Sequence, residues 1–339
     1  MTMEKIHIDE AQPLIDEHIN CLIEDDSAID CDLKDVTPDD LPDWYDGKLY
    51  KEAQRFYRRN ILSINAQNFV GLLSILAIPS ILKVLIYTKQ HDTPCAAFKR
   101  YLQTTLHIVN LYKNDINVRD SNWYKTINTI RWKHGTNNKR SQCARVGPIY
   151  NRDMAFTQCA FVGHILTSAK TIGLHNTPEE DEAITHFWRV NGYMLGIPDR
   201  LNVCRKNADE TRDLCQKIND KVYKKYLSEA PPEFYDTVTT TINGLWCVDP
   251  FLNTDAIIAL TLKLYGLEYK SLGWYSRINL EFRIYLFKLF HQPYIGTILR
   301  EFNNYFLIGL LWISEHFPVL AWMNFGKTNS QINLYPKYK

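Results

Sequence analysis

Two short groups of polar side chains have the types and spacing to do chemistry. The first comprises Arg100, Gln103, Thr104 and His107, at spacings of three, four and seven from Arg100. These spacings place all four on one face of a helix whose other positions are apolar. Because a polar stripe on an apolar helix is buried only when it has partners, the pattern predicts one wall of a polar site.

The second group is the segment Arg131-Trp132-Lys133-His134. Arg131 and His134 lie three residues apart and so share a helix face. A buried haem needs one imidazole for its iron, guanidinium groups for two propionates, an apolar slot, and hydrogen-bond donors on the opposite face. The two groups supply these residue types and are plausible facing walls of one site.

Spacing alone leaves simpler interpretations open. His134 can be a surface or core-capping histidine, and Arg100 can form an ordinary surface salt bridge. Gln103 and Thr104 can be packing residues whose side chains bond back to their own helix. His107, one turn further on, is either a packed core histidine or a second imidazole for the same iron.

The elements that must position these residues are helices. Apolar periodicity predicts helices over residues 48–66, 68–87, 94–113, 122–135, 151–171, 179–196, 208–228, 232–243, 253–265 and 275–300, with no strand alternation. The run 68–87 is apolar almost all round and is expected to be a core helix broken at Pro79. A second apolar run, 305–323, is interrupted by Glu315, His316 and Pro318 and is expected to be a core or interfacial helix.

Composition excludes several classes of protein. The chain has 339 residues, 45% of them hydrophobic, and a net charge of +1, which gives no electrostatic argument for a nucleic-acid partner. Its 8 cysteines form no CxxC pair, so we expect reduced thiols and an intracellular protein. The N-terminus has no signal-peptide pattern. No GxGxxG, P-loop, HExxH, GxSxG or thiolate-haem motif is present.

From Trp44 to about residue 265 the chain resembles the ER-bound oxygenase and latex-clearing protein family, in particular its animal (arthropod-like) members. Six segments carry the resemblance in the family's order. They are residues 41–46 (LPDWYD), 85–89 (LIYTK), 100–104 (RYLQT), 131–134 (RWKH), 153–163 (DMAFTQCAFVG) and 186–197 (HFWRVNGYMLGI).

The resemblance implies an all-helical protein that binds haem b through one histidine and uses dioxygen to cleave an isoprenoid C=C bond into carbonyl fragments. On this basis His134 matches the axial iron ligand. Arg100 and Arg131 match family arginines that would pair with propionates or orient the site. Gln103 and Thr104 fall on the opposite face, where Thr104 matches a hydrogen-bond donor to oxygen.

The chain also departs from the family pattern. Latex-clearing proteins have a lysine where this chain has Gln103, and a neutral amide is a poor iron ligand. Lys89 replaces the glycine of the family's turn. The rubber oxygenases use a glutamate base on the preceding apolar helix, but segment 68–87 contains no Asp or Glu. Catalysis of that kind is therefore less secure than haem binding.

These observations give a set of expectations. The fold is a single large all-α domain with a globin-like helical core around a haem pocket. An acidic arm over 1–43 precedes the oxygenase-like domain 44–300, and an apolar helix and basic tail follow over 301–339. The function is a haem b-dependent oxygenase acting with dioxygen on a lipophilic, isoprenoid or unsaturated lipid substrate; the alternative is a non-catalytic haem- or lipid-binding protein. The protein is expected in the cytoplasm or at the surface of the ER membrane.

Overall fold

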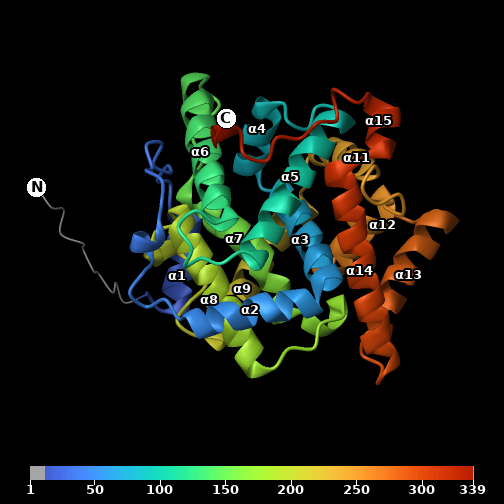
Figure 1. Ribbon diagram of the computed structural model, residues 1–339, viewed down its shortest axis with the longest axis horizontal. Helices are drawn as coiled ribbons and strands as arrows, with labels where there is room; N and C mark the ends of the chain where they lie inside the picture. The colour runs from blue at the N-terminus through green and yellow to red at the C-terminus, as the bar shows by residue number, and fades with distance from the viewer. Residues whose placement is uncertain (1–11, 339) are drawn as a thin grey trace, which may run out of the picture.

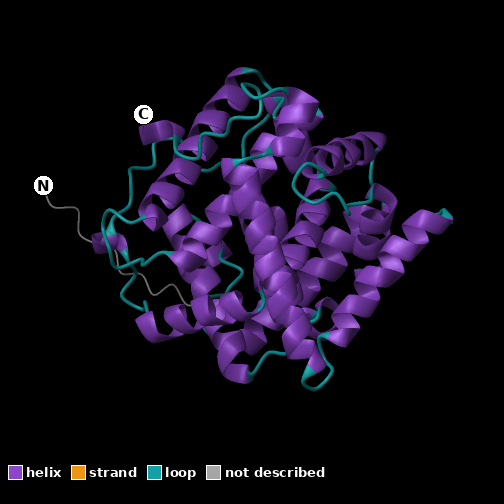
Figure 2. Ribbon diagram, turned by 45° about the vertical axis from the view of Figure 1, so that its right-hand side comes forward, coloured by secondary structure: helices purple, strands orange, loops and turns teal. Residues whose placement is uncertain are grey.

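The computed structural model describes residues 12–338, and every regular element in that range is helical (Figure 2). The extended backbone makes a single antiparallel bridge between Ala28 and Tyr150. The expectation of an all-α domain is therefore confirmed. The segment 1–11 of the acidic arm lies outside the described residues.

The helices pack around a shared core, with α3 and α5 near the centre and α13 to α15 along one side (Figure 1). The α-helices are α1 Ile15–Glu24, α2 Gly47–Arg59, α3 Ile61–Leu76, α4 Pro79–Thr88, α5 Pro94–Lys113, α6 Asn122–Cys143, α7 Asn151–Thr167, α8 Pro178–Leu195, α9 Ala208–Ile218, α10 Lys224–Ser228, α11 Pro232–Leu245, α12 Thr254–Leu264, α13 Trp274–Leu289, α14 Ile295–His316 and α15 Val319–Phe325. Short single turns are η1 Pro38–Asp40, η2 Ala169–Ile172, η3 Asp199–Leu201, η4 Asn219–Tyr223 and η5 Pro336–Tyr338.

Local sequence explains where the two site helices begin and end. Helix α5 starts at Pro94, with the Thr93 hydroxyl accepting a hydrogen bond from the Ala96 amide, and it spans the predicted residues 94–113. Helix α6 continues to Cys143, beyond the predicted end at 135. Gly135 does not stop it, because a Cβ at this position would lie 2.7 Å from the Cys31 carbonyl oxygen, so the glycine serves close packing.

Prolines break both long apolar runs. Helices α3 and α4 meet at Pro79 with a bend of 95°, as expected from the sequence. The prediction of one helix over 275–300 is wrong. The chain turns at 290–294, where Pro293 precedes Tyr294 with a φ of 60°, and α14 begins at Ile295. A second bend of 46° at Pro318 separates α14 from α15.

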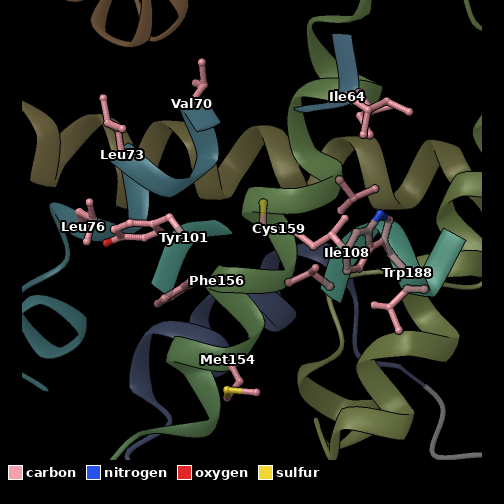
Figure 3. Packing of buried hydrophobic residues seen from close by; sticks show 14 of the residues in the cluster. Ile64, Val70, Leu73, Leu76, Tyr101, Ile108, Met154, Phe156, Cys159 and Trp188 are labelled. Carbon is pink, nitrogen blue, oxygen red and sulfur yellow. The ribbon is translucent and has the colours of Figure 1, made fainter. Parts of the chain in front are cut away.

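The core that supports the site lies between α3, α5, α7 and α8 (Figure 3). Ile64, Leu73 and Leu76 of α3 are fully buried. At Gly71 the backbones of α3 and α7 approach so closely that a Cβ would lie 2.1 Å from the Ala160 carbonyl oxygen. Close approach of two helices fixes their relative position, because packed interiors leave no room to slide.

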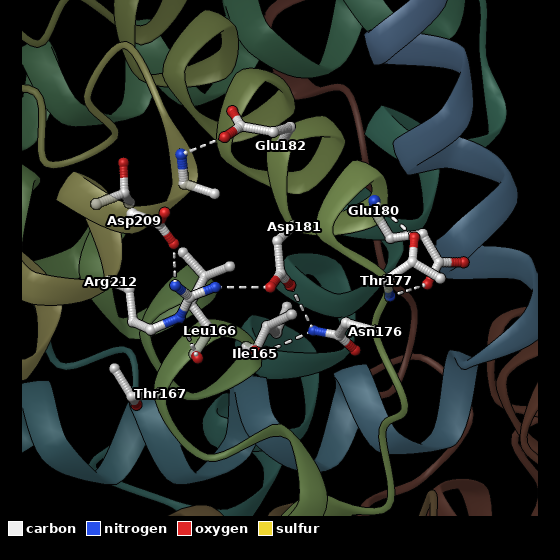
Figure 4. A network of polar contacts seen from close by, with 12 residues as sticks. Ile165, Leu166, Thr167, Asn176, Thr177, Glu180, Asp181, Glu182, Asp209 and Arg212 are labelled. Carbon is white, nitrogen blue, oxygen red and sulfur yellow. Dashed lines mark hydrogen bonds and ion pairs between the residues drawn. The ribbon is translucent and has the colours of Figure 1, made fainter.

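A polar network behind the core holds α7, α8 and α9 together (Figure 4). The Arg212 guanidinium donates to Asp181 at 2.7 Å, to Asp209 at 2.5 Å and to the Leu166 carbonyl oxygen at 3.1 Å. Asp181 also accepts from the Asn176 side chain at 2.8 Å. Because one guanidinium serves three partners, the network fixes the ends of three helices at once.

The ends of the described chain both pack on the domain. Helix α1 lies in the acidic segment, and it buries His18, Ile19 and Leu22. Residues 329–338, called the C-terminal strap below, cross α5 and reach α6 (Figure 1). The basic tail expected from the sequence thus ends in a segment that is docked on the protein.

Candidate functional site

A cavity with a volume of about 300 Å³ lies between α3, α5, α6, α7 and α8. Its wall is mostly apolar, with contributions from Phe69, Leu72, Ile108, Phe161 and Trp188. Pockets of this size and character hold small molecules or cofactors. Both predicted polar groups reach this cavity, since Arg100, Gln103, Thr104, His107 and His134 all line it.

His134 is the histidine best placed to hold a metal. Its Nδ1 is buried without a hydrogen-bond partner, and neither ring nitrogen bonds to a described residue. Burial, together with the nearby charges of Arg100 and Lys133, lowers the pKa of the imidazole to about 4. The ring is therefore neutral at physiological pH and has free lone-pair capacity, as an axial iron ligand requires.

Two other histidines have protein partners. The Nε2 of His164 lies 2.9 Å from the Tyr265 hydroxyl, and the Nε2 of His186 accepts from the Asp46 amide at 2.9 Å. These contacts give both side chains a structural role. His107 is intermediate: its Nδ1 lies 3.4 Å from the Thr126 hydroxyl, while its buried Nε2 has no partner. Burial lowers the pKa of His107 to about 3.

Two cations border His134. Arg100 of α5 and Lys133 of α6 line the cavity, and Arg100 donates to the Gln90 side chain at 3.2 Å. Burial lowers the pKa of Lys133, and the neighbouring charge of Arg100 lowers it further. The Arg100–Lys133 pair forms a positive region beside a neutral imidazole, which fits a ligand with carboxylates at one edge.

Arg131 is not part of the cavity wall. Its guanidinium donates to the Lys34 carbonyl oxygen at 2.9 Å and to the Met194 carbonyl oxygen at 2.9 Å. Arg131 and His134 are three residues apart, so their side chains leave the helix axis in directions that differ by about 60°. This difference is enough to turn Arg131 toward the end of α8. Gly196 ends α8 with a φ of +94° and leaves room for the guanidinium. Arg131 thus joins the N-terminal segment to α8, and the structure does not bring it to the cations that face His134.

The α5 residues opposite His134 are held by their surroundings. The Thr104 hydroxyl donates to the Arg100 carbonyl oxygen at 3.0 Å, and the Gln103 amide donates to the Asn333 carbonyl oxygen at 2.9 Å. The strap also places Tyr335 against His107, with ring centroids 5.9 Å apart. The C-terminal strap therefore fixes the outer side of the helix that carries this stripe.

Sequence reasoning missed several polar residues of the cavity wall, among them Lys133 and Asn68. Lys133 stood inside a quoted motif but was given no role. Asn68 was counted as part of an apolar run, although both polar atoms of its side chain are buried in the wall without partners. An isolated amide in an apolar helix was the available signal, since such a group is costly to bury alone.

No cluster of three or more metal-ligating side chains occurs within residues 12–338. All eight cysteines are free thiols, in agreement with the sequence expectation. The cavity offers two neutral imidazoles, His134 and His107, which suits the one or two axial positions of a haem iron better than a zinc ion with its about four protein or water ligands.

Comparison with known proteins decides the family. Residues 57–236, about half of the chain, match the model for the catalytic domain described as ER-bound oxygenase mpaB/B′/rubber oxygenase.

The chain belongs to this oxygenase family. The family's catalytic domain is an oxygenase, and the matched residues include α3, α5, α6, α7 and α8, between which the cavity lies. No curated protein matches the sequence.

A solved structure, that of a latex clearing protein in the closed state, has the same fold. It superposes with a TM-score of 0.58 over 80% of this chain and 76% of that chain, at 16% sequence identity. Agreement at so low an identity concerns the course of the chain and not the chemistry. It extends the shared architecture beyond residues 57–236 that the family model matches.

Among the described residues, no single helix is both long and apolar enough to cross a membrane, although two bent helix pairs meet the length and composition criteria together. These pairs are α3 with α4 and α14 with α15.

Proposed function

We propose that the protein is a haem b-dependent oxygenase acting on a lipophilic, unsaturated substrate. The observation that carries the proposal is the unpartnered, neutral imidazole of His134 in an apolar cavity within an oxygenase domain. His134 would hold the iron, and Arg100 with Lys133 would pair with the propionates. Haem, when bound, supplies the oxygen chemistry.

The protein's own contribution is orientation and exclusion of water. Phe69, Leu72 and Trp188 give the cavity an apolar wall in which an isoprenoid chain can lie. Addition of both atoms of one dioxygen molecule across a C=C bond breaks that bond and forms two carbonyl groups. The atoms and electrons balance, and no external reductant is needed.

Gln103 and Thr104 are proposed to polarise dioxygen on the side of the cavity opposite His134. Both donors are already used in this structure, by the Asn333 and Arg100 carbonyl oxygens. A role in polarisation would require the Thr104 hydroxyl proton to rotate away from its helix. The Gln103 amide has a second N–H and needs no such change.

The alternative is a haem- or lipid-binding protein without turnover. Two observations favour it: Gln103 is tied to the C-terminal strap, and α3 and α4 contain no carboxylate that could serve as a base. Oxygen uptake separates the two functions. An oxygenase consumes dioxygen and yields carbonyl products from an unsaturated terpenoid, whereas a binder does neither.

Absorbance of the purified full-length protein tests the haem. A Soret band that is present in the wild type and lost in His134→Ala is expected. His316→Ala is the matched control, because His316 is exposed on α14 and outside the cavity. A colourless wild type prepared with haem supplied, or a band that survives His134→Ala, would contradict the proposal.

We also propose that α13 to α15 rest on a membrane surface, as expected for a protein at the ER. The exposed aromatic and aliphatic side chains of this region are Trp274, Tyr275, Ile278, Phe282, Tyr285, Ile295, Ile298, Phe302, Tyr305, Phe306, Trp312, Ile313, Phe317, Val319 and Met323. On α14 they recur at three- and four-residue intervals, which makes one apolar stripe. Trp and Tyr favour the boundary between lipid and water.

Sedimentation with phospholipid vesicles tests this contact. Replacing both Phe302 and Tyr305 by Ser is expected to reduce vesicle binding at least about tenfold, since each large side chain contributes a kcal/mol or more when buried in lipid. The melting temperature should stay unchanged, because these side chains are 67% and 70% exposed. Unchanged vesicle binding would exclude this face as the contact.

A further inference from the structure

The amide of Asn68 on α3 is an unsatisfied polar group in the cavity wall. Its Nδ2 and Oδ1 are both buried, and neither has a hydrogen-bond partner. Nearly all buried polar groups in proteins are hydrogen-bonded, so an exception calls for a ligand or a function. The haem role proposed above uses His134, Arg100 and Lys133 and leaves Asn68 without a task.

Asn68 contrasts with Asn65, Thr105 and Thr157, three other polar residues of the wall. Asn65, one turn earlier, donates from Nδ2 to the Ile61 carbonyl oxygen at 2.8 Å. The hydroxyl of Thr105 donates to the Tyr101 carbonyl oxygen at 3.0 Å, and that of Thr157 to the Asp153 carbonyl oxygen at 2.7 Å. These groups are satisfied within the protein, whereas Asn68 has both donor and acceptor capacity to spare.

The cavity-facing side of α3 changes character along the helix. Asn65 and Asn68 occupy its first half, and Phe69, Leu72 and Ile75 follow at helical spacing. From Asn68 to Ile75 the helix rises about 10 Å. A ligand lying along α3 therefore meets an amide at one end and hydrocarbon over the rest of its length.

The chemistry of the amide selects the ligand's polar group. A hydroxyl can donate to Oδ1 and accept from Nδ2, which satisfies both atoms. A carbonyl or a carboxylate can only accept and would leave Oδ1 unpaired. The cavity-facing residues of α3 carry no charge, so nothing on this helix favours an ionised group.

We infer that Asn68 binds the hydroxyl group of an unsaturated lipid alcohol whose hydrocarbon chain lies along α3 toward Ile75. This inference rests on the proposed function and narrows its substrate class from any unsaturated lipid to an amphiphilic alcohol. It distinguishes the ligand from a plain hydrocarbon, which would leave the amide buried and unpaired.

Two probes of equal chain length test the inference: farnesol, which has a hydroxyl, and farnesene, which lacks it. The purified full-length protein takes up each probe from a cyclodextrin carrier, and the bound amount gives the dissociation constant. Each dissociation constant is corrected for the affinity of the carrier for that probe. On this scale the wild type is expected to bind farnesol at least about tenfold more tightly than farnesene. Asn68→Leu should remove this preference mainly by weakening farnesol binding.

Thr105→Val is the matched control, because it removes a hydroxyl from the same cavity that is already bonded to its own helix. It should keep the preference. Asn68→Leu should melt at or above the wild-type temperature, since an unpaired amide is replaced by an apolar group. Asn68→Ala provides a smaller second variant in case the leucine does not fit.

The outcomes separate this inference from the haem proposal. A preference for farnesol that persists in both Asn68 variants overturns the inference, as does equal loss of preference in Thr105→Val. Loss of the Soret band in Asn68→Leu with the preference intact also overturns it and assigns Asn68 to the cofactor. A colourless wild type that still prefers farnesol through Asn68 supports the inference and refutes haem binding.

Discussion

Two apolar runs of this chain have similar composition and opposite surroundings. The pair α3 and α4 and the pair α14 and α15 both meet the criteria for a bent membrane span. Ile64, Leu73 and Leu76 of α3 are nevertheless fully buried in the protein, whereas Ile298 and Tyr305 of α14 are each 70% exposed. Hydrophobicity predicts that a surface will be covered, but the partner that covers it depends on the rest of the fold.

The difference follows from what packs on each run. Helix α7 lies against α3, and Gly71 allows the two backbones to touch. Helix α14 contacts α3 and α5 through one side only, with Asn304 accepting from the Leu62 amide and donating to the Arg59 carbonyl oxygen. The first run thus builds the cavity, and the second presents its outer side chains to the surroundings.

The largest expected contrast comes from one glycine in each run. Gly71→Ala places a methyl group 2.1 Å from the Ala160 carbonyl oxygen and should lower the free energy of unfolding by more than about 3 kcal/mol. Gly309→Ala meets no atom within 4 Å and should raise it by up to about 1 kcal/mol through helix propensity. Urea unfolding followed by circular dichroism measures both. Similar effects of the two substitutions would show that α14 is as tightly packed as α3.

Acidification should lower the stability of the fold through buried histidines that lie around α3. Burial lowers the pKa of His107 to about 3 and those of His134 and His164 to about 4. Between pH 6.5 and 4 the unfolded chain binds protons that the folded chain excludes, so stability is full above pH 6.5 and falls as the pH decreases. Asp153, whose pKa burial raises to about 6, opposes this trend, because its stabilising contribution is lost as the pH rises.

The urea midpoint, measured from pH 7.5 to 4.5, should therefore decrease on acidification, since three histidines outweigh one carboxyl group. His134→Gln should flatten the profile, while His316→Gln, on the exposed run, should leave its shape unchanged. A midpoint that does not vary with pH would mean that these imidazoles are not buried. The contrast between a buried run, α3 and α4, and an exposed run, α14 and α15, would then no longer hold.

The smallest expected effect concerns the strap that leads from the second run back to the cavity. Tyr335→Phe removes the hydroxyl that accepts from Asn110 at 2.8 Å and should cost about 0.5–1.5 kcal/mol. Tyr338→Phe, at the exposed end of the strap, is the control and should cost less. Thermal unfolding measures both. A larger loss for Tyr338 would place the main anchor of the strap at α6 instead of α5.

Much of the fold followed from the sequence, for identifiable reasons. Pro79 and Pro94 act through backbone geometry that no tertiary contact can change, so the break after α3 and the start of α5 were predicted correctly. The break at 290–294 was missed, because Tyr294 adopts a positive φ that its residue type does not favour. Periodicity continues across such a turn and gives no sign of it.

The candidate site divides in the same way. Helical spacing brought Arg100, Gln103, Thr104 and His134 to one cavity, since residues on one face of a helix must share an environment. It failed for Arg131, whose long side chain reaches backbone oxygens on other segments. It could not give the role of Asn333, because a main-chain oxygen leaves no trace in residue type.

The C-terminal strap has a consequence for biosynthesis. A ribosome makes the chain from the N-terminus, so the helices that surround the cavity emerge well before Asn333 and Tyr335. Until residues 329–338 have emerged and docked, the outer side of α5 at Gln103 and His107 lacks the cover that this strap provides. A cofactor or lipid that enters the nascent protein therefore meets a looser wall than the finished one, and docking of the strap then secures it.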